Sequence, residues 1–463
     1  MTGSRENLAR NENLACMTAA EVAAALPTHP PVDHRSALLS ARQRMLATGQ
    51  WTASQFMGRR WPIGCVALEI TQRCNLDCTA CYLSENSESV GDLPLQEVFR
   101  RIDMIFDYYG RDTDVQVTGG DPTLREKGEL VEIVRRIRQK GMRPTLFTNG
   151  IRAKRPLLED LVGAGLVDVA FHVDLTQNRR GYGTESALNA IRQEYVERAR
   201  GLGLPIMFNT TVTNENFSQI PDVVRFLVRN SDAVRLASFQ IHAETGRGKP
   251  RGSRLDVAAL RRQIDAGVGV PLSFDTAHVG HSRCNRYAMA AVTNGKVYDI
   301  LDDKRLFESV LEQTSEVRFD RQDRSAVVTA FLGSIAKSPP LTFAVLVWLL
   351  RKVWQARRDL FRARGRVNKL SFFIHDFMDS CSLESDRLDA CVFSAATTRG
   401  PVSMCLHNAK RDAFILEKVP VSRNGGLGFW DPLTRKESDR PQARPNEMES
   451  KAKATAVRLK GAA

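Results

Sequence analysis

Residues 65–83 read CVALEITQRCNLDCTACYL and contain the feature that decides the fold. The first seven letters form an apolar run that is typical of a buried strand. Directly after that run, Cys74, Cys78 and Cys81 stand on one short stretch in the spacing CxxxCxxC, and no histidine is near them in the sequence. A strand that leads into three closely spaced thiols predicts a metal-binding loop.

These three cysteines suit an iron–sulfur cluster better than zinc. A structural zinc site is closed by four protein ligands, and no fourth ligand stands nearby. A [4Fe–4S] cluster is normally held by four cysteines, so three would leave one iron open to a ligand that is not protein. A zinc site completed by a distant residue and buried free cysteines are the alternatives.

The architecture follows from an alternation of short apolar runs with longer segments of helical period. Six strands are expected at residues 65–71, 115–118, 144–148, 167–174, 205–212 and 234–242. Helices are expected between them at residues 95–109, 129–141, 157–164, 186–203 and 221–229. This pattern predicts an α/β fold, a partial (βα)6 TIM-like barrel whose functional groups lie at the carboxyl ends of the strands.

Further candidate residues stand at those strand ends. Gly119, Gly120, Asp121 and Pro122 follow the second strand, and paired glycines let a backbone approach a ligand closely. A tight turn without a ligand is the alternative.

Two polar residues stand at later strands. Asp174 ends the fourth strand and Asn209 lies in the fifth. Both are candidates for cofactor binding. The alternatives are that Asp174 caps the next turn and that Asn209 satisfies backbone groups.

The cysteine motif, the glycine turn and the six-unit barrel together resemble the radical SAM superfamily. In that family a [4Fe–4S] cluster with one open iron binds S-adenosylmethionine (SAM) and splits it into methionine and a 5′-deoxyadenosyl radical. The resemblance implies that Cys74, Cys78 and Cys81 hold this cluster. It also implies that the backbone of the glycine turn receives the amino group of SAM, although Asp121 stands where the family usually has glutamate.

The resemblance extends to the polar strand ends, where family members often contact the ribose or carboxylate of SAM. It implies this role for Asp174 and Asn209. The chain departs from the family at Ala80, where many members carry an aromatic residue just before the third cysteine. Tyr82 is the aromatic residue of this loop and becomes the candidate for contact with SAM.

A second set of cysteines follows the barrel at Cys284, Cys381, Cys391 and Cys405. Four thiolates fully ligate a second [4Fe–4S] cluster. Tetrahedral zinc held by the same four is the alternative, although the spacings contain no CxxC pair. His375 and His407 are expected to be hydrogen-bonded neighbours of these cysteines rather than ligands.

The C-terminal run GPVSMCLHN, residues 400–408, resembles a subgroup that contains archaeal tetraether lipid synthases and radical SAM methylases of the methanopterin pathway. The resemblance covers residues 58–418. It implies hydrogen abstraction from an unactivated carbon, with C–C bond formation or methylation of a lipid or other hydrophobic substrate. A pterin or another polar small molecule is the alternative substrate, and a flavodoxin- or ferredoxin-type protein is the expected electron donor.

The length of 463 residues fits one barrel with an added module. We expect a loosely ordered N-terminal arm at residues 1–57, the barrel at 58–275, a C-terminal module at 276–430 and a disordered tail at 431–463. Nine cysteines without a signal-peptide pattern favour a reducing cytoplasm and metal binding. The net charge of +13 is compatible with nucleic acid, anionic lipid or acidic partners.

Residues 326–370 carry a separate signal. The stretches 326–335 and 341–350 each hold ten uncharged residues, too few to cross a membrane, and residues 351–370 hold eight Lys or Arg and one acidic residue. This order predicts a segment that lies on an anionic membrane, as a peripheral contact at its inner face. A core helical hairpin followed by a solvated basic helix is the alternative.

A hypothesis from another class is a zinc-bearing protein on a membrane or on nucleic acid, with both sets of cysteines structural. Nucleic acid is disfavoured because the sequence contains no recognised RNA-binding module.

Overall fold

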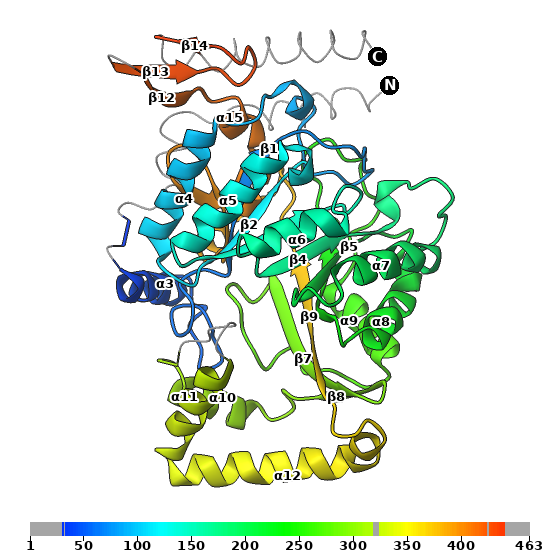
Figure 1. Cartoon of the computed structure of the whole chain (residues 1–463). Coiled ribbons are helices and arrows are strands. Elements are labelled where there is room, and N and C mark those ends of the chain that lie inside the picture. The colour runs from blue at the N-terminus through cyan, green and yellow to red at the C-terminus, as the bar shows by residue number, and fades with distance from the viewer. Residues whose placement is uncertain (1–29, 32, 318–323, 424–425, 440–463) are drawn as a thin grey trace.

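A parallel sheet of six strands forms the centre of the molecule (Figure 1). The computed structural model describes residues 30–31, 33–317, 324–423 and 426–439. The central strands are β1 (Cys65–Thr71), β2 (Asp114–Gly119), β3 (Arg143–Thr148), β4 (Asp168–His172), β5 (Ile206–Val212) and β6 (Val234–Ile241). Each pairs in parallel with the next, which confirms the α/β fold with a partial (βα)6 barrel.

Helices cover the outer face of this sheet; the first five lie in the order that the sequence predicts, and α9 was not predicted. They are α4 (Leu95–Tyr109), α5 (Lys127–Gln139), α6 (Arg155–Gly163), α7 (Glu185–Ala199), α8 (Ile220–Arg229) and α9 (Val257–Val268). In α4, for example, Val98, Ile102, Ile105 and Tyr109 recur at helical spacing and are buried against the sheet. Strands and helices thus share one large apolar core.

The sheet continues beyond the barrel on both edges. β9 (Asn368–Asp376) pairs in parallel with β6 and is followed outward by the antiparallel strands β7 (Asn285–Thr293) and β8 (Lys296–Asp299). On the other edge, β10 (Phe393–Ala396) pairs in parallel with β1 and carries the antiparallel β11 (Pro401–Ser403).

These two extensions approach each other. The rings of Phe373 on β9 and Phe393 on β10 lie 6.2 Å apart, although seven strand pairings separate the two strands in the sheet. The sheet therefore curls, and its two ends meet across the open side of the barrel.

Other elements lie outside this sheet. Short 3-10 turns follow several strands: η1 (Ser87–Ser89), η2 (Pro122–Leu124), η3 (Leu175–Gln177) and η4 (Phe217–Gln219). The remaining helices are α3 (His34–Ala47), α10 (Lys304–Gln313), α11 (Arg324–Ala336), α12 (Pro339–Arg362), α13 (Ser385–Asp389), α14 (Met404–Ala409) and α15 (Arg411–Ile415). A small separate sheet contains β12 (Val419–Arg423), β13 (Gly426–Trp430) and β14 (Glu437–Ser438).

The expected segment boundaries are not visible as structural breaks. Within the expected arm, Met45 of α3 packs with Met57 and with Val392 in one buried cluster. The expected C-terminal module contributes β7 to β11 to the barrel's own sheet. Residues 1–29 and 440–463, most of the expected arm and tail, lie outside the described residues.

Candidate active site

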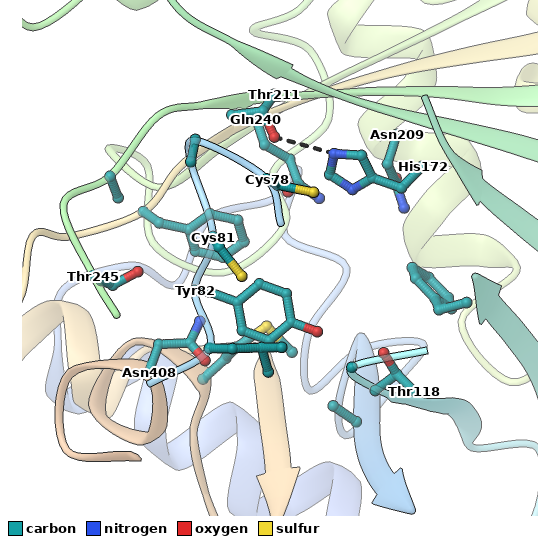
Figure 2. Close-up of a pocket in the computed structure, with 18 of the residues that line it drawn as sticks. Cys78, Cys81, Tyr82, Thr118, His172, Asn209, Thr211, Gln240, Thr245 and Asn408 are labelled. Carbon is teal, nitrogen blue, oxygen red and sulfur yellow. Dashed lines mark hydrogen bonds between the residues drawn. The ribbon is translucent and has the colours of Figure 1, made fainter. Parts of the chain in front are cut away.

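A cavity of about 220 Å³ lies at the carboxyl ends of the six central strands (Figure 2). Its wall includes side chains from every one of them: Glu69, Thr118, Phe147, His172, Asn209 and Gln240. Six strands can line one cavity of this size only when the sheet curves around it. Met378, Met404 and Cys405 from the C-terminal part complete the wall. The prediction that functional groups gather at the strand ends is consistent with this placement.

The loop after β1 brings Cys74, Cys78 and Cys81 into this cavity. The loop is held by backbone hydrogen bonds rather than by a helix. Residues 247–249 supply three of them, from Arg247 N to Leu83 O (2.8 Å), from Gly248 N to Cys81 O (3.1 Å) and from Lys249 N to Thr79 O (2.6 Å). A fourth runs from Thr79 N to the carbonyl of Thr176, beyond β4. The cysteine loop is therefore pinned between β4 and the segment after β6.

The three thiols share one electrostatic environment. Burial, with smaller contributions from neighbouring Asp and Cys side chains, raises the pKa of Cys74 and of Cys78. Burial acts to lower the pKa of Arg247, but the adjacent Cys81 and Glu88 raise it. Nε of Arg247 is buried and has no hydrogen-bond partner in the described part of the chain.

This donor set fits an iron–sulfur cluster. Three soft thiols on one loop, beside an unsatisfied guanidinium N–H, can accept a group that carries negative charge and sulfur acceptors. Within the described residues, no three His, Cys, Asp or Glu side chains already converge as a preformed metal site.

The glycine turn packs directly against the start of the cysteine loop. Gly119 has a φ of +132°, and a Cβ atom there would lie 1.9 Å from the carbonyl oxygen of Thr71. A Cβ on Gly120 would lie 2.1 Å from the carbonyl oxygen of Arg73. Only glycine permits this approach, which is secured by hydrogen bonds from Gly120 N to Thr71 O (3.0 Å) and from Asp121 N to Arg73 O (2.7 Å).

Within this turn, Gly119 and Gly120 line the cavity, whereas Asp121 and Pro122 lie behind it. The Asp121 carboxylate is fully buried and accepts hydrogen bonds from Thr123, from Thr148 and from the backbone N–H of Asn149. Its side chain thus ties the end of β2 to the end of β3.

Tyr82 lies on the cavity wall and connects two parts of the site. Its hydroxyl donates to the carbonyl of Gly119 at 2.5 Å, and its ring packs under the guanidinium of Arg411 at 4.7 Å. Tyr82 therefore braces the glycine turn against the C-terminal part of the chain.

Asp174 does not reach the cavity, but His172 does. Asp174 is fully buried and accepts from Nε2 of His172 at 2.6 Å, as well as from Thr176 and Thr211. Burial acts to raise the pKa of Asp174, but His172 lowers it to about 2. For His172, burial acts to lower the pKa and Asp174 outweighs it, so the pKa is raised.

His172 is a group that the sequence reasoning missed. Its other ring nitrogen, Nδ1, has no hydrogen-bond partner among the described residues and is free to meet a ligand. The signal was available, because His172 stands two residues before Asp174 on the same face of the strand.

Asn209 of β5 lies on the cavity wall with its side-chain amide unpaired within the described structure. It does not satisfy backbone groups, which was the alternative for this residue. Gln240 of β6 lines the same wall.

A buried ion pair that includes the wall residue Glu69 was also missed. Nη1 of Arg411 donates to Glu69 of β1 at 2.7 Å, and Gln72 donates to the same carboxylate at 2.7 Å. Burial acts to raise the pKa of Glu69, but Arg411, together with His407 and Gln72, lowers it to about 2. This pair fastens α15 to the first strand, across 342 positions of sequence.

The second set of cysteines is only partly assembled. Burial raises the pKa of Cys284 to about 11, with a smaller contribution from Cys391, and burial, together with Cys391 and Cys284, raises the pKa of Cys405. Nε of Arg387 donates to the sulfur of Cys284 at 3.1 Å. Cys381 is exposed on the turn after β9. Cys65 is buried at the start of β1, and Cys391 lies close enough to help raise its pKa. The sulfur of Cys65 accepts a hydrogen bond from the side chain of Gln116.

The two histidines near this set are packed groups. His375 stacks on Phe373 and shares a hydrogen bond with Asn285 at 3.1 Å, and burial lowers its pKa to about 3. His407 stacks on Phe414, and burial lowers its pKa to about 4.

Residues 324–362 do not form the core helical hairpin that was one of the two interpretations of this segment. The stretch 341–350 and the basic residues after it form one helix, α12, which ends at Arg362. Most of its apolar side chains are exposed, so a core hairpin is wrong for this segment. In the described residues no single helix meets the length and hydropathy needed to cross a membrane, and only α11 and α12 together, bent by 120°, meet both.

Comparison with known proteins identifies the central part of the chain. Residues 68–227 match the model of the radical SAM superfamily. The 7,8-dihydro-6-hydroxymethylpterin dimethyltransferase of Methanocaldococcus jannaschii is 27% identical over 186 residues, which cover 39% of this chain and 36% of that protein. A probable GTP 3′,8-cyclase of Pyrococcus abyssi is 30% identical over 186 residues, which cover 40% of this chain and 59% of that protein.

Among solved structures, Streptococcus suis SuiB bound to the peptide SuiA overlaps with a TM-score of 0.35 and 18% identity, over 43% of this chain and 45% of that chain. All these similarities concern part of each protein, and the matching region spans between about a third and three fifths of the two curated relatives. The superfamily match favours iron–sulfur over zinc at the first three cysteines, because its members use a [4Fe–4S] cluster and SAM.

Proposed function

We propose that this chain is a radical SAM enzyme in which Cys74, Cys78 and Cys81 hold a [4Fe–4S] cluster beside bound SAM, because residues 68–227 match the model of that superfamily. When bound, these two groups supply a 5′-deoxyadenosyl radical that abstracts hydrogen from an unactivated carbon. The observation that carries the proposal is the convergence of the three cysteines and the glycine turn on one cavity lined by all six strands.

The chain's own residues position the cofactor and exclude water. The backbone of Gly119 and Gly120 forms one wall, where no side chain intervenes, and receives the amino group of SAM. Nδ1 of His172 and the side-chain amide of Asn209 have no hydrogen-bond partner within the described residues. Both groups face the cavity and hold the polar groups of SAM. Asp121 and Asp174 act from behind the wall, because their carboxylates orient the turn and the imidazole.

The test is anaerobic reconstitution of the full chain with iron and sulfide, followed by reduction with dithionite in the presence of SAM. We expect 5′-deoxyadenosine to form, and Cys78→Ala to abolish its formation. Stoichiometric zinc without acid-labile sulfide, or undiminished cleavage by Cys78→Ala, would refute the proposal.

A second [4Fe–4S] cluster is proposed at Cys284, Cys381, Cys391 and Cys405. Cys284 and Cys391 lie close enough to Cys405 to raise its pKa, and the proposal adds Cys381, which is exposed on the turn after β9. Zinc held by the same residues is the competing proposal. About eight irons per chain are expected with two clusters and about four with zinc at this site.

Cys65 provides a matched control for the fourth ligand. It is buried near Cys391, whereas Cys381 is exposed. We expect Cys381→Ala to lower the iron content towards four per chain and Cys65→Ala to leave it near eight. The reverse result would assign Cys65 as the fourth ligand.

For the substrate we propose a lipid or other hydrophobic molecule that undergoes C–C bond formation or methylation. Apolar side chains of the cavity wall, such as Phe147, Ile241 and Met404, support this choice. A pterin or another polar small molecule is the second candidate, supported by the name of the M. jannaschii relative.

Comparison of lipids and small metabolites from cells with and without the protein, grown on methionine labelled in its methyl group, separates the two substrates. A labelled lipid product supports the first candidate, and a labelled pterin supports the second. A flavodoxin- or ferredoxin-type protein is the proposed electron donor. The proposal also includes peripheral contact with the inner face of a membrane, for which α12 offers the surface.

A further inference from the structure

α12 presents two sides of opposite character. One side holds the helix to the protein: Leu341 and Ala356 are buried, Lys352 donates to Asp302 (2.7 Å), and Asp359 accepts from Tyr298 (2.7 Å). These positions recur at helical spacing along one face. The helix is therefore fixed to β8 and the segment after it by Lys352 and Asp359, and it also packs against α10 and α11.

The outward side of α12 carries an apolar stripe, which Arg357 and Arg358 interrupt before Phe361. Its members are exposed and recur at spacings of three, four and seven residues: Phe343, Leu346, Val347, Leu350, Trp354 and Phe361. The largest of them are among the most exposed apolar side chains of the protein, at 68% for Phe343, 65% for Trp354 and 87% for Phe361. Isolated exposed apolar residues are ordinary, but a stripe along a 24-residue helix marks an interaction surface.

Positive charge lies beside this stripe. Arg357, Arg358 and Arg362 are exposed and form no ion pair with any carboxylate in the described ranges. The guanidinium of Arg357 lies over the Trp354 ring at 4.1 Å, so an aromatic and a basic group meet at the edge of the stripe. Arg364, Arg366 and Lys369 extend the same charge beyond the helix.

Figure 1 shows α12 at the lower edge of the molecule, apart from the helices that cover the barrel. It lies at the end of the barrel opposite the cavity. Five residues separate α12 from β9, which runs parallel to β6, and Phe377, directly after β9, lines the cavity. A nine-residue strand spans roughly 30 Å, so the stripe and the cavity are separate surfaces.

We propose that the outward stripe of α12 docks this protein on an anionic membrane surface, with its apolar side chains inserted at the level of the lipid headgroups and the flanking arginines on phosphates. The charge favours this partner over a second copy of the chain, because two copies would bring their arginine-rich edges together. The docking deepens the membrane contact proposed above and does not depend on the radical chemistry.

The test measures co-sedimentation of the full, anaerobically purified chain with lipid vesicles. Vesicles of phosphatidylcholine containing phosphatidylglycerol are compared with pure phosphatidylcholine, at low and at physiological salt. We expect binding to the anionic vesicles that weakens with salt. Arg357→Gln, Arg358→Gln and Arg362→Gln together should lower the partition coefficient at least about tenfold.

A matched triple variant removes the same charge elsewhere. Arg135, Arg229 and Arg262 are exposed on α5, α8 and α9, and their replacement by Gln should leave binding within about twofold of wild type. Phe343→Ser with Trp354→Ser tests the apolar part and should weaken binding at least about tenfold. Cleavage of SAM by both α12 variants should equal wild type, which shows that they remain folded.

Three results would overturn the docking proposal. They are the absence of binding to anionic vesicles, an equal loss of binding in the control triple variant, and a wild-type dimer in solution that Phe343→Ser with Trp354→Ser converts to monomer. Failure of SAM cleavage in the wild type would instead count against the proposed enzyme and leave the vesicle result standing.

Discussion

The two sets of cysteines reach their positions by different routes. Cys74, Cys78 and Cys81 stand within eight residues of one another on a loop that backbone hydrogen bonds pin in place. Cys284, Cys391 and Cys405 come from three distant segments and meet only because the two ends of the sheet curl together. The first set stands on one loop, which hydrogen bonds from other segments hold in place, whereas the second set needs three segments to pack together. The two sets should therefore fail under different perturbations.

The largest effect is expected from a substitution that disturbs only the first set of cysteines. Gly119→Ala places a Cβ within 1.9 Å of the Thr71 carbonyl and forces the turn away from the cysteine loop. We expect SAM cleavage to fall at least about a hundredfold because a displaced turn misplaces the cofactor. We also expect a loss of about 3 kcal/mol in unfolding free energy, measured in urea.

Gly163→Ala at the end of α6 is the control, since no atom outside its chain neighbours and its own helix backbone lies within 4 Å of its added Cβ. The free energy of unfolding of Gly163→Ala should equal that of wild type or exceed it by up to about 1 kcal/mol. Unaltered SAM cleavage in Gly119→Ala would show that the turn does not position the cofactor.

The effect on SAM cleavage is expected to be smaller for Glu69→Gln, which acts mainly on stability by loosening the C-terminal part that carries Cys405. The change leaves Arg411 buried without its charged partner and should cost about 3–5 kcal/mol of unfolding free energy. Glu159→Gln, in a half-exposed pair with Arg155, should cost less than about 0.5 kcal/mol. A cost for Glu69→Gln no larger than that of Glu159→Gln would contradict this role.

The ion pair between Glu69 and Arg411 also makes the free energy of unfolding depend on pH, and the direction of this dependence follows from the pKa. The pKa of Glu69 is lowered in the folded protein from 4.5 to about 2, so its contribution is present above pH 4.5 and is lost as the pH falls towards 2. When acid unfolding is followed by circular dichroism, the free energy of unfolding should therefore fall less steeply with decreasing pH in this window for Glu69→Gln than for wild type.

The smallest effect leaves both sets of cysteines intact. Asn209→Ala removes one unpaired amide from the cavity and should raise the KM for SAM about fivefold with little change in kcat. Asn214→Ala, an exposed residue that bonds the Ser253 carbonyl, is the control and should leave KM unchanged. Equal KM values for wild type and Asn209→Ala would place SAM away from this side chain.

The same contrast between local and distant contacts explains what could be predicted from the sequence. The central strands lie within two residues of their expected bounds because runs such as residues 65–71 are buried on both faces and flanked by turn residues. The cysteine loop and the glycine turn were visible as motifs because their residues are adjacent in sequence.

Contacts between distant segments were not predictable. Nothing near Glu69 identifies Arg411 as its partner, and nothing near residue 276 shows that β9 and β10 join the barrel sheet. The apolar stretch of α12 was ambiguous because a core helix and an interfacial helix can have the same composition. Only the exposure of residues such as Phe343 decides against the core hairpin.

The bonds that hold the cysteine loop also bear on how the protein matures. Residues 247–249 and Thr176 fix the loop through backbone groups, none of which is a metal ligand. The loop is therefore held in place before any iron arrives, and insertion of a cluster has only to draw its three thiols together. Newly made protein should accumulate as a folded, metal-free form during iron starvation and become active on resupply without new synthesis.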